Sequence, residues 1–250
     1  MRVVVVTGTS TSVGKTVVTA ALTACALAAG RTVAVVKPVQ TGVTPGEPGD
    51  LDDVARLTGA SDLHEYARFG EPLAPGTAAR RLGVHGPRVP GLAGRIGALA
   101  VRDLVLIEGA GGPLVEFNAA GETLVDLVGE LNPAAPVEVV LVASAGLGVL
   151  NIAALTAQAL SSAGLPLAGV VVGDWPADPD LAARCNLVDL PRYAGAALAG
   201  VVPAGSGRLG SAPFAAIARQ SLAPRFDGDF DASVFVRSMA PPPPVQEKQP

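Results

Sequence analysis

The chain contains few aromatic and few charged residues. Of its 250 residues, 4% are aromatic and 16% are charged, whereas 49% are hydrophobic. The core must therefore be built mainly from Val, Leu and Ala, and apolar runs of this kind are typical of a parallel sheet covered on both faces. The formal net charge is −4, and the sequence has no Lys/Arg tract. This balance argues against a nucleic-acid or membrane-surface partner.

Histidine and cysteine occur only twice each. His64 and His85 have no Cys or His partners at metal-ligand spacing, so we expect both to be exposed and neither to bind a metal. Cys25 falls in an apolar helical pattern, and Cys185 lies in no nucleophile motif. We expect no disulfide between them, which predicts a reducing compartment.

Long hydrophobic runs are absent as well. Only four valines follow Arg2, too few for the apolar part of a signal peptide. The most apolar later stretch, residues 137–160, is interrupted by Glu138 and Gly146, which predicts a strand, a loop and a helix instead of a membrane span. We therefore expect a cytoplasmic protein without a membrane partner.

Apolar runs of strand length alternate with longer helical patterns along most of the chain. Such alternation predicts an α/β fold of three layers, helix–sheet–helix, around a mostly parallel sheet. Ligands of such sheets bind beyond the carboxyl ends of the strands. The predicted strands are 2–7, 32–36, 104–108, 137–143, 168–173 and 198–202; the predicted helices are 15–29, 52–58, a part of 89–100, 124–131, 150–163, 179–186 and 213–219.

The last residues of the chain have a different composition. Residues 240–250 read Ala-Pro-Pro-Pro-Pro-Val-Gln-Glu-Lys-Gln-Pro, and consecutive prolines before a polar end cannot pack as helix or sheet. We predict a single domain over residues 1–236 and a Pro-rich, disordered tail over 237–250. A ligand for a proline-recognition domain is the alternative for the tail.

The most informative motif follows the first predicted strand and reads Gly-Thr-Ser-Thr-Ser-Val-Gly-Lys-Thr over residues 8–16. A glycine-rich turn between a strand and a helix lets backbone N–H groups surround phosphate oxygens, and the helix N-terminus adds partial positive charge. Lys15 can reach the outer phosphates, and the Thr16 hydroxyl can hold Mg²⁺. The motif predicts a fold like that of the phosphate-loop NTPases. The residues expected at a nucleoside triphosphate are Gly8, Thr9, Ser12, Val13, Gly14, Lys15, Thr16 and Val17.

The spacing of this motif differs from the usual one. Five residues separate Gly8 from Gly14, whereas the usual pattern has four. A chance Gly-Lys-Thr in a chain of 30 glycines is the alternative. The predicted strand before the motif and the predicted helix after it both favour the phosphate loop.

The second predicted strand leads into Lys-Pro-Val-Gln-Thr-Gly over residues 37–42. Lys37 follows a parallel strand and is expected to face the phosphate loop, where a cation stabilises charge on a transferring phosphoryl group. The Thr41 hydroxyl is within reach of the same space. A solvated surface lysine is the alternative for Lys37.

Two acidic positions lie near the same edge of the predicted sheet. Asp50, Asp52 and Asp53 open a helix, and capping needs only one carboxylate, so Asp50 is a candidate metal ligand. Glu108 closes an apolar strand and can hold Mg²⁺ opposite Thr16. The alternatives are a pure capping role for the aspartates and an accidental charge at the strand end for Glu108.

Two glycine-rich turns offer further binding groups. Gly109, Ala110 and Gly111 follow Glu108, and their small size allows a substrate to approach the backbone closely. The turn at residues 146–151 enters a helix whose free N–H groups form a second anion site. That site could accept a substrate carboxylate.

Together these motifs resemble the dethiobiotin synthetase family. The resemblance rests on the phosphate loop at 8–16, the 37–42 motif, the acidic loop at Asp50, Val-Leu-Ile-Glu-Gly-Ala-Gly-Gly-Pro-Leu-Val at 105–115, and the turn at 146–151, in the same order over residues 1–203. It implies that 7,8-diaminopelargonic acid takes up CO₂ as a carbamate and that the carbamate attacks the γ-phosphate of the nucleotide. The neighbouring amine then closes the cyclic urea, which releases nucleoside diphosphate and phosphate.

The resemblance also implies roles for individual residues. Lys37 and Lys15 would neutralise the carbamate and γ-phosphoryl charge, and Thr11 and Thr41 would orient the carbamate. Thr16, Asp50 and Glu108 would hold Mg²⁺, with ATP or another nucleoside triphosphate as co-substrate. The family's active site lies at a homodimer interface, so the substrate carboxylate would be bound across it. The remaining expected contacts are Gly109, Ala110, Gly111, Gly148, Val149, Leu150 and Asn151 for the substrate and Gly173 and Pro203 for the base.

The chain departs from the family pattern in two places. Ser10 and Ser12 stand where members often carry acidic residues, which makes the loop less negative. Gly173-Asp174-Trp175-Pro176 occupies the place where the family often has an Asn that reads adenine. The base would then be read by backbone groups near residues 203–205, or only loosely.

Other classes of protein share parts of this pattern. Partitioning-type ATPases usually have Lys after the first loop glycine, where this chain has Thr9, and they lack the 37–42 motif. Amidotransferases related to cobyrinate diamide synthase need a second domain with a nucleophilic Cys, and GTPases need Asn-Lys-x-Asp. A non-catalytic nucleotide-binding module is disfavoured by the presence of Lys37, Asp50 and Glu108 together.

Overall fold

The computed structural model describes residues 2–131 and 136–239. In this part of the chain, seven parallel strands form one sheet in the order β4-β2-β6-β1-β7-β8-β9. The strands are β1 (Arg2–Gly8), β2 (Val33–Lys37), β4 (Leu63–Glu65), β6 (Leu104–Glu108), β7 (Val137–Ala143), β8 (Leu167–Trp175) and β9 (Leu198–Pro203). A separate parallel pair joins β3 (Gln40–Thr41) to β5 (Arg68–Phe69).

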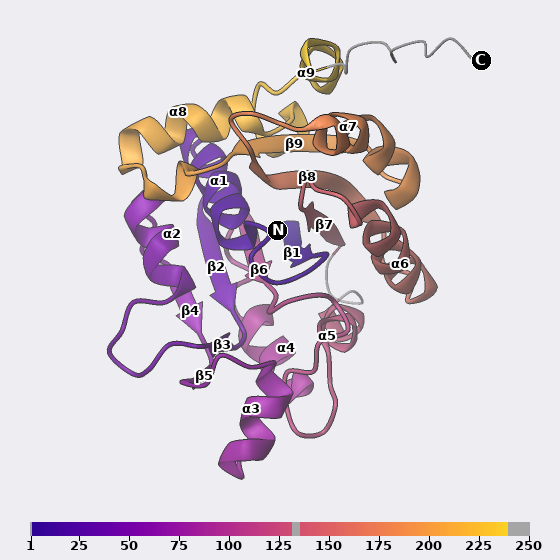
Figure 1. Ribbon diagram of the computed structural model, residues 1–250. Coiled ribbons are helices and arrows are strands. Elements are labelled where there is room, and N and C mark those ends of the chain that lie inside the picture. Colours follow the sequence, from indigo (N-terminus) through magenta and orange to yellow (C-terminus); the bar gives the residue numbers. More distant parts are fainter. Residues whose placement is uncertain (1, 132–135, 240–250) are drawn as a thin grey trace, which may run out of the picture.

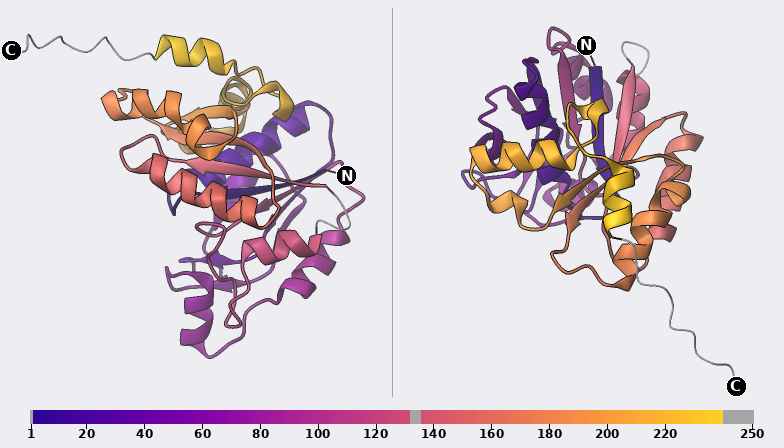
Figure 2. Two further views of the ribbon diagram at one scale, coloured as in Figure 1. Left: turned by 90° about the vertical axis from the view of Figure 1, so that its right-hand side faces the viewer. Right: turned by 90° about the horizontal axis from the view of Figure 1, so that it is seen from above.

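Helices cover both faces of the large sheet (Figures 1 and 2). On one face, α1 (Lys15–Ala28) lies between α2 (Asp50–Thr58) and α8 (Ser211–Ser221). On the other face, α4 (Val89–Gly97) and α5 (Leu124–Leu131) pack against one half of the sheet, and α6 (Val149–Ser162) and α7 (Leu181–Ala194) pack against the other half. The helix α3 (Pro75–Leu82) contacts β3 and β5, and α9 (Ala232–Ser238) packs beside β9. The fold is therefore the predicted three-layer α/β/α arrangement.

The valine-rich strands explain the two cores. Successive residues of β1 point to opposite faces, as strand geometry requires. Val4 and Val6 pack with α1, α2 and α8, whereas Val3 and Val5 pack with α4 and α5. All four side chains are at most 1% exposed. Because both faces are covered, these strands are apolar at nearly every position.

The strand order places the site. From β1 the chain passes to β2 on one side of the sheet, and the later strands β7, β8 and β9 lie on the other side. Loops that follow β1, β2 and β6 therefore meet at one edge, beyond the carboxyl ends of neighbouring strands. The phosphate loop, Lys37 and Glu108 all lie at this edge.

Each predicted strand and helix is present, although some bounds were wrong. Helix α7 was predicted to end at Asn186 but continues to Ala194 and includes Pro191. Its buried face, which includes Leu187 and Leu190, packs against the sheet and outweighs the hydrogen bond that proline removes. The sequence did not predict β3, β4, β5, α3 or α9, all of which are short elements.

Three smaller expectations had different outcomes. His85 is exposed, whereas His64 is only partly exposed, and its Nε2 lies 2.7 Å from Asp62 Oδ1. Cys25 and Cys185 are both free thiols. Residues 240–250 of the predicted tail lie outside the described residues, and α9 extends to Ser238, just beyond the expected domain end. Among the described residues, no helix is long and apolar enough to cross a membrane.

Candidate active site

The phosphate loop is held in place by contact with the end of β8. Gly14 is the N-cap of α1 and has a left-handed backbone (φ 88°), which favours glycine. A Cβ on Gly14 would collide with the carbonyl group of Gly173, and a Cβ on Gly173 would collide with the Val13 carbonyl oxygen. Gly173, which the sequence analysis expected near the nucleotide base, thus also allows the phosphate loop and β8 to approach closely.

The loop presents free donors at its centre. The backbone N–H groups of residues 10–14 make no hydrogen bond within residues 2–131 and 136–239, whereas the Thr9 N–H donates to Val142 O at 2.9 Å. Ser12 has a positive φ of 56°, which is uncommon for a residue other than glycine. A curved run of free N–H groups at a helix N-terminus is a binding site for phosphate oxygens.

Lys15 lies folded against the same loop. Its Nζ donates to the Ser10 carbonyl oxygen at 2.8 Å, and the residue is 8% exposed. Burial, and then repulsion by the Lys37 ammonium, lowers the pKa of Lys15 below its ordinary value. An anion bound at the loop would therefore interact with a cation that is already partly desolvated.

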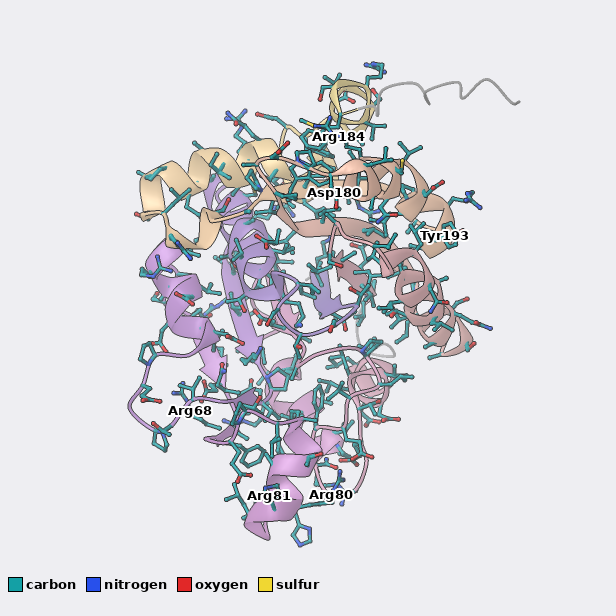
Figure 3. All side chains as sticks on the ribbon, in the orientation of Figure 1. Arg68, Arg80, Arg81, Asp180, Arg184 and Tyr193 are labelled. Atoms are coloured by element: carbon teal, nitrogen blue, oxygen red, sulfur yellow. The ribbon has the colours of Figure 1, made fainter. Side chains whose placement is uncertain are left out.

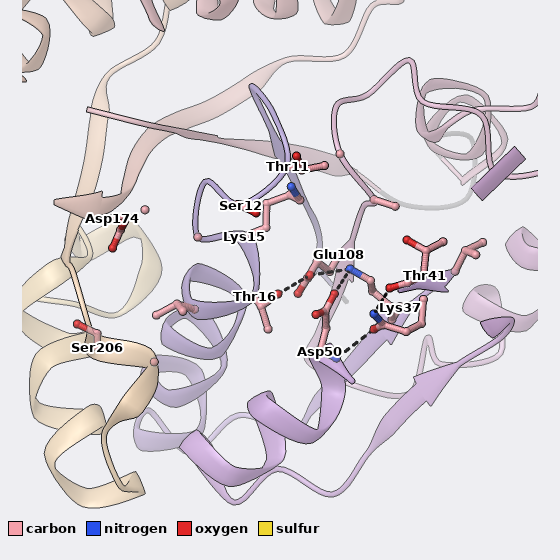
Figure 4. Close-up of a pocket in the computed structure, with 18 of the residues that line it drawn as sticks. Thr11, Ser12, Lys15, Thr16, Lys37, Thr41, Asp50, Glu108, Asp174 and Ser206 are labelled. Carbon is pink, nitrogen blue, oxygen red and sulfur yellow. Dashed lines mark hydrogen bonds and ion pairs between the residues drawn. The ribbon is translucent and has the colours of Figure 1, made fainter. Parts of the chain in front are cut away.

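A second lysine sits at the centre of a buried charge cluster (Figure 4). Lys37 Nζ lies 2.8 Å from Glu108 Oε1, forms an ion pair with Asp50, and approaches Gly109 O at 3.4 Å. The Thr16 hydroxyl donates to the same Glu108 Oε1 at 2.9 Å. Lys37 is 3% exposed and Glu108 is 1% exposed, so the interpretation of Lys37 as a solvated surface lysine was wrong.

The charges in this cluster stabilise one another. Burial disfavours the charged form of Lys37, but the Glu108 and Asp50 carboxylates outweigh it and raise the pKa of Lys37 above its ordinary value. Burial likewise disfavours ionised Asp50, yet Lys37 holds the pKa of Asp50 below its ordinary value. Glu108 Oε2 is buried and has no hydrogen-bond partner among the described residues. An unpartnered buried carboxylate oxygen is costly and marks a place for an additional positive group.

The start of α2 explains why Asp50 is free to face Lys37. Asp52 accepts from the Gly49 N–H at 2.6 Å and closes the helix start, so capping does not occupy Asp50. The Asp50 N–H donates instead to Gln40 Oε1 at 3.0 Å. This bond links the start of α2 to β3, and the buried Gln40 side chain is itself held by its Nε2, which donates to Thr41 O at 3.0 Å.

Arg68 holds the loop that precedes α2 (Figure 3). Its guanidinium donates to Glu47 O at 2.6 Å and forms a two-point ion pair with Glu65, at 2.7 and 2.8 Å. Since Glu47 lies three residues before Asp50, Arg68 positions the carboxylate without touching it. The sequence analysis missed both Gln40 and Arg68, because neither role is visible until β3, β5 and α2 are brought together.

The main cavity, of about 500 Å³, runs along the phosphate loop. We call its part at Lys15, Thr16, Lys37, Asp50 and Glu108 the charged end. We call its opposite part the loop end; Figure 4 shows Asp174 and Ser206 there, away from Lys37. The loop end consists of Gly173, Asp174, Pro203, Gly205, Ser206 and Gly207.

Most of the predicted site residues meet in this cavity. Thr11, Ser12, Gly14, Val17, Thr41, Ala110 and Gly111 line it together with the charged end, Gly173 and Pro203. Gly8 and Val13 are buried under the loop. Gly109 does not line the cavity, and its carbonyl oxygen faces Lys37 Nζ. The sequence analysis did not anticipate Val39, Gln40, Asp174, Ser206 or Gly207 as lining residues, whereas Gly205 falls within residues 203–205, which were expected near the base.

A second cavity, of about 570 Å³, adjoins the first. The two share Thr11, Ser12, Thr41, Ala110 and Gly111 as a common wall. Residues 72–75 and Val115 form the far side of the second cavity. A molecule in the second cavity would thus lie against the phosphate loop and the 37–42 motif.

The start of α6 lies apart from both cavities. Gly148, Val149, Leu150 and Asn151 line neither of them in the described part of the chain. Beside this helix start, large apolar side chains are exposed, with Leu147 at 91% and Leu155 at 57%. Leu114, in the loop after β6, is 61% exposed. The expected substrate contact from this helix therefore does not form within one copy of the chain.

Similar proteins are found by family model, by sequence and by structure. A family model described as an AAA domain matches residues 2–206. The ATP-dependent dethiobiotin synthetases of Frankia casuarinae and Streptomyces coelicolor are each 58% identical to this chain over 236 residues, which cover 94% of this chain and 98% of theirs. The cell division ATPase MinD of Pyrococcus furiosus has a similar structure, with a TM-score of 0.51 and 19% identity over 81% of this chain and 83% of its own.

Proposed function

Since the chain belongs to the ATP-dependent dethiobiotin synthetase family, we propose that it forms dethiobiotin from 7,8-diaminopelargonic acid, CO₂ and ATP. The observation that supports this reaction best is the buried Lys37, held between Glu108 and Asp50 beside the phosphate loop. A fixed cation there suits a reaction in which an anionic carbamate must approach an anionic γ-phosphate.

The reaction needs charge neutralisation and positioning but no nucleophilic side chain. A carbamate oxygen attacks the γ-phosphorus and ADP leaves; the second amine then attacks the carbamate carbon, and phosphate leaves as the urea ring closes. Lys15 would bind the outer phosphates, and Lys37 would neutralise charge between carbamate and γ-phosphate. The raised pKa of Lys37 keeps it protonated for this role. Thr11 and Thr41 would donate hydrogen bonds to the carbamate.

Mg²⁺ fits the residues at the charged end. Thr16, Asp50 and Glu108 supply hard oxygen ligands, and the unpartnered Oε2 of Glu108 is available. The described residues contain no group of three or more His, Cys, Asp and Glu at metal-binding spacing, so phosphate oxygens and water would complete the shell, as is usual for Mg²⁺. The ion would neutralise the phosphate oxygens on which charge develops.

We place the diamine in the second cavity. It adjoins the phosphate loop through Thr11 and Ser12 and the 37–42 motif through Thr41, so an amine bound there would lie beside the γ-phosphate position. The backbone at Ala110 and Gly111 forms the shared wall. The apolar walls at residues 72–75 and Val115 suit the aliphatic chain of the substrate.

We further propose a homodimer that shares its active sites. The helix start at 148–151 offers N–H groups for the distal carboxylate, yet it lies outside both cavities of its own copy. The exposed Leu114, Leu147 and Leu155 supply apolar surface for an interface next to it. Sedimentation at assay concentrations should show a dimer, and a fully active monomer would contradict the shared site. We keep the cytoplasm as the expected compartment, since both thiols are free.

The decisive test is product formation. Purified protein with diaminopelargonic acid, bicarbonate, Mg²⁺ and ATP should release phosphate and yield dethiobiotin, detected by mass spectrometry. Lys37→Ala should abolish the product, while Arg208→Ala, next to the cavity but not lining it, should not. Lys37→Gln serves as a second variant, because its amide can still donate a hydrogen bond to the buried Glu108, whereas alanine leaves that carboxylate without a donor from this position. ATP hydrolysis without dethiobiotin would indicate a partitioning-type ATPase, and binding without hydrolysis a non-catalytic module.

A further inference from the structure

The loop end of the main cavity carries a single charged side chain among its described lining residues. Asp174 is exposed and lines the cavity, and none of its side-chain atoms forms a hydrogen bond or ion pair with the described residues. Its neighbours there are glycine, proline and serine. The Ser206 hydroxyl is already engaged, because it donates to Pro203 O at 2.6 Å.

The position of Asp174 follows from the way the nucleotide must lie. If the proposed function is right, the phosphates occupy the loop at residues 10–16, and the diamine occupies the second cavity. The cavity continues from there to Asp174 and Ser206 (Figure 4). The base of the nucleotide then occupies the loop end, which is the remaining part of the cavity.

The loop end offers one strong acceptor and two backbone donors. An ionised carboxylate only accepts hydrogen bonds. The N–H groups of Gly205 and Ser206 make no hydrogen bond within the described ranges 2–131 and 136–239. The neighbouring Ala204 N–H is used, since it donates to Trp175 O at 2.7 Å. The available pattern is thus acceptor at Asp174 and donor at residues 205–206.

Guanine matches this pattern more fully than adenine. Guanine carries O6, an acceptor, next to the N1–H and N2–H₂ donors, so it can give two hydrogen bonds to one carboxylate and accept one from a backbone N–H. Adenine gives one bond from its N6–H₂ group, while its N1 lone pair faces the same carboxylate unfavourably. Hydrogen bonds to a charged group are about twice as strong as neutral ones.

We propose that Asp174 is a specificity-determining residue that makes this enzyme accept GTP alongside ATP. The inference rests on the proposed function for the location of the base. The reaction itself is unchanged, because the charged end contacts only phosphates, carbamate and metal. The residue acts on the choice of nucleotide alone.

The test compares ATP, GTP and ITP in dethiobiotin formation by the full chain with Mg²⁺. ITP lacks the N2 amine of GTP, so the comparison isolates one bond to the carboxylate. The variants are Asp174→Asn, which removes the charge at constant size, and Asp174→Ala. Asp178→Asn is the matched control, because Asp178 is an exposed aspartate in the loop after β8 that does not line the cavity. Binding of GDP and ADP, measured by calorimetry, gives a readout that does not depend on turnover.

We expect the wild-type kcat/KM for GTP to equal or exceed that for ATP, and to exceed that for ITP by about fivefold. Asp174→Asn should lower the GTP/ATP ratio about tenfold, Asp174→Ala should make GTP and ITP equal, and Asp178→Asn should change neither. Dethiobiotin formed with ATP and a GTP/ATP ratio that is insensitive to Asp174 would overturn the proposal and leave the proposed function intact. If no nucleotide gives dethiobiotin, the proposed function fails, and the GDP/ADP binding ratio in Asp174→Asn still decides the role of Asp174.

Discussion

The charged end and the loop end of the main cavity are built in opposite ways. At the charged end, Lys37 and Glu108 are nearly inaccessible and each contacts several other polar groups. At the loop end, Asp174 is exposed and its carboxylate has no partner among the described residues. The first set of groups is fixed by the carboxyl ends of β2 and β6, whereas Asp174 stands near the carboxyl end of β8 and residues 205–207 follow β9.

This difference separates two tasks of the site. Groups that stabilise developing charge must be preorganised, which requires burial and several contacts each. Groups that select a base only have to present a donor or an acceptor at the surface of the cavity. Changes at the charged end should therefore alter the rate and leave the GTP/ATP ratio unaltered, and changes at Asp174 should do the reverse.

The largest effect is expected from Glu108→Gln. The amide keeps the size of the side chain but removes the charge that holds Lys37 and would bind Mg²⁺, so dethiobiotin formation should fall at least about 100-fold. Because a buried ion pair is broken, we also expect a loss of about 3 kcal/mol in the free energy of unfolding, measured in urea. The GTP/ATP ratio of the residual activity should stay within about twofold of the wild type.

Glu130→Gln is the control, because Glu130 is an exposed glutamate at the end of α5. It should retain full activity and stability. If Glu108→Gln kept activity near that of Glu130→Gln, Glu108 would not belong to the reacting centre.

A smaller effect is expected from Arg68→Ala. Without its contacts to Glu47 and Glu65, the loop before α2 should loosen and Asp50 should lose its position. The concentration of Mg²⁺ needed for half-maximal rate should rise about tenfold, with little change in kcat at saturating Mg²⁺. A magnesium titration at fixed ATP and diamine measures this.

Arg81→Ala is the matched control for that experiment. Arg81 forms a similar two-point ion pair with Glu71, but on the exposed face of α3 (Figure 3). A magnesium curve for Arg68→Ala that overlays the curve for Arg81→Ala would show that the loop does not depend on Arg68.

The smallest effect concerns pH and the two lysines. The pKa of Lys15 is lowered, mainly by burial, while that of Lys37 is raised by its carboxylates. As pH rises from neutral toward the ordinary lysine value of 10.5, Lys15 should lose its proton first, and affinity for ATP should fall about fivefold. Equilibrium binding of ATP across this range measures the change.

Lys15→Arg should flatten this profile, because arginine keeps its charge. An affinity for ATP that is constant across the same range in the wild type would mean that Lys15 does not contact the phosphates while charged.

The sequence predicted the charged end better than the loop end. Lys37 and Glu108 stand out because each is a charge at the end of an apolar strand, and parallel strands bring such ends together. Asp50 was the right aspartate of three to face Lys37, although only the structure shows that Asp52 closes the helix. These inferences needed only strand direction and local helix geometry.

Gln40, Arg68 and the full role of Gly173 could not be predicted in the same way. Gln40 acts on a helix ten residues further along, and Arg68 on a loop more than twenty residues earlier. Position 173 requires a glycine because it packs against Gly14, which lies far earlier in the sequence, in the loop after β1. Such contacts depend on how loops and short strands fold over the sheet, and hydrophobic periodicity carries no information about that.

Helix α1 links the chemistry to the thermal behaviour of the whole molecule. Lys15 and Thr16 form its first turn, and residues 18–26 of the same helix are buried between the sheet, α2 and α8. On warming, the first turn of α1 can therefore unfold only when the packing of α1 against the sheet, α2 and α8 is lost. The exposed side chain of Asp174, although it stands on β8 between the buried Gly173 and Trp175, is not held by contacts of this kind, and Gly205 is exposed as well. Heating should therefore weaken the discrimination between nucleotides at moderate temperature. Turnover should persist at that temperature and be lost abruptly when the domain unfolds.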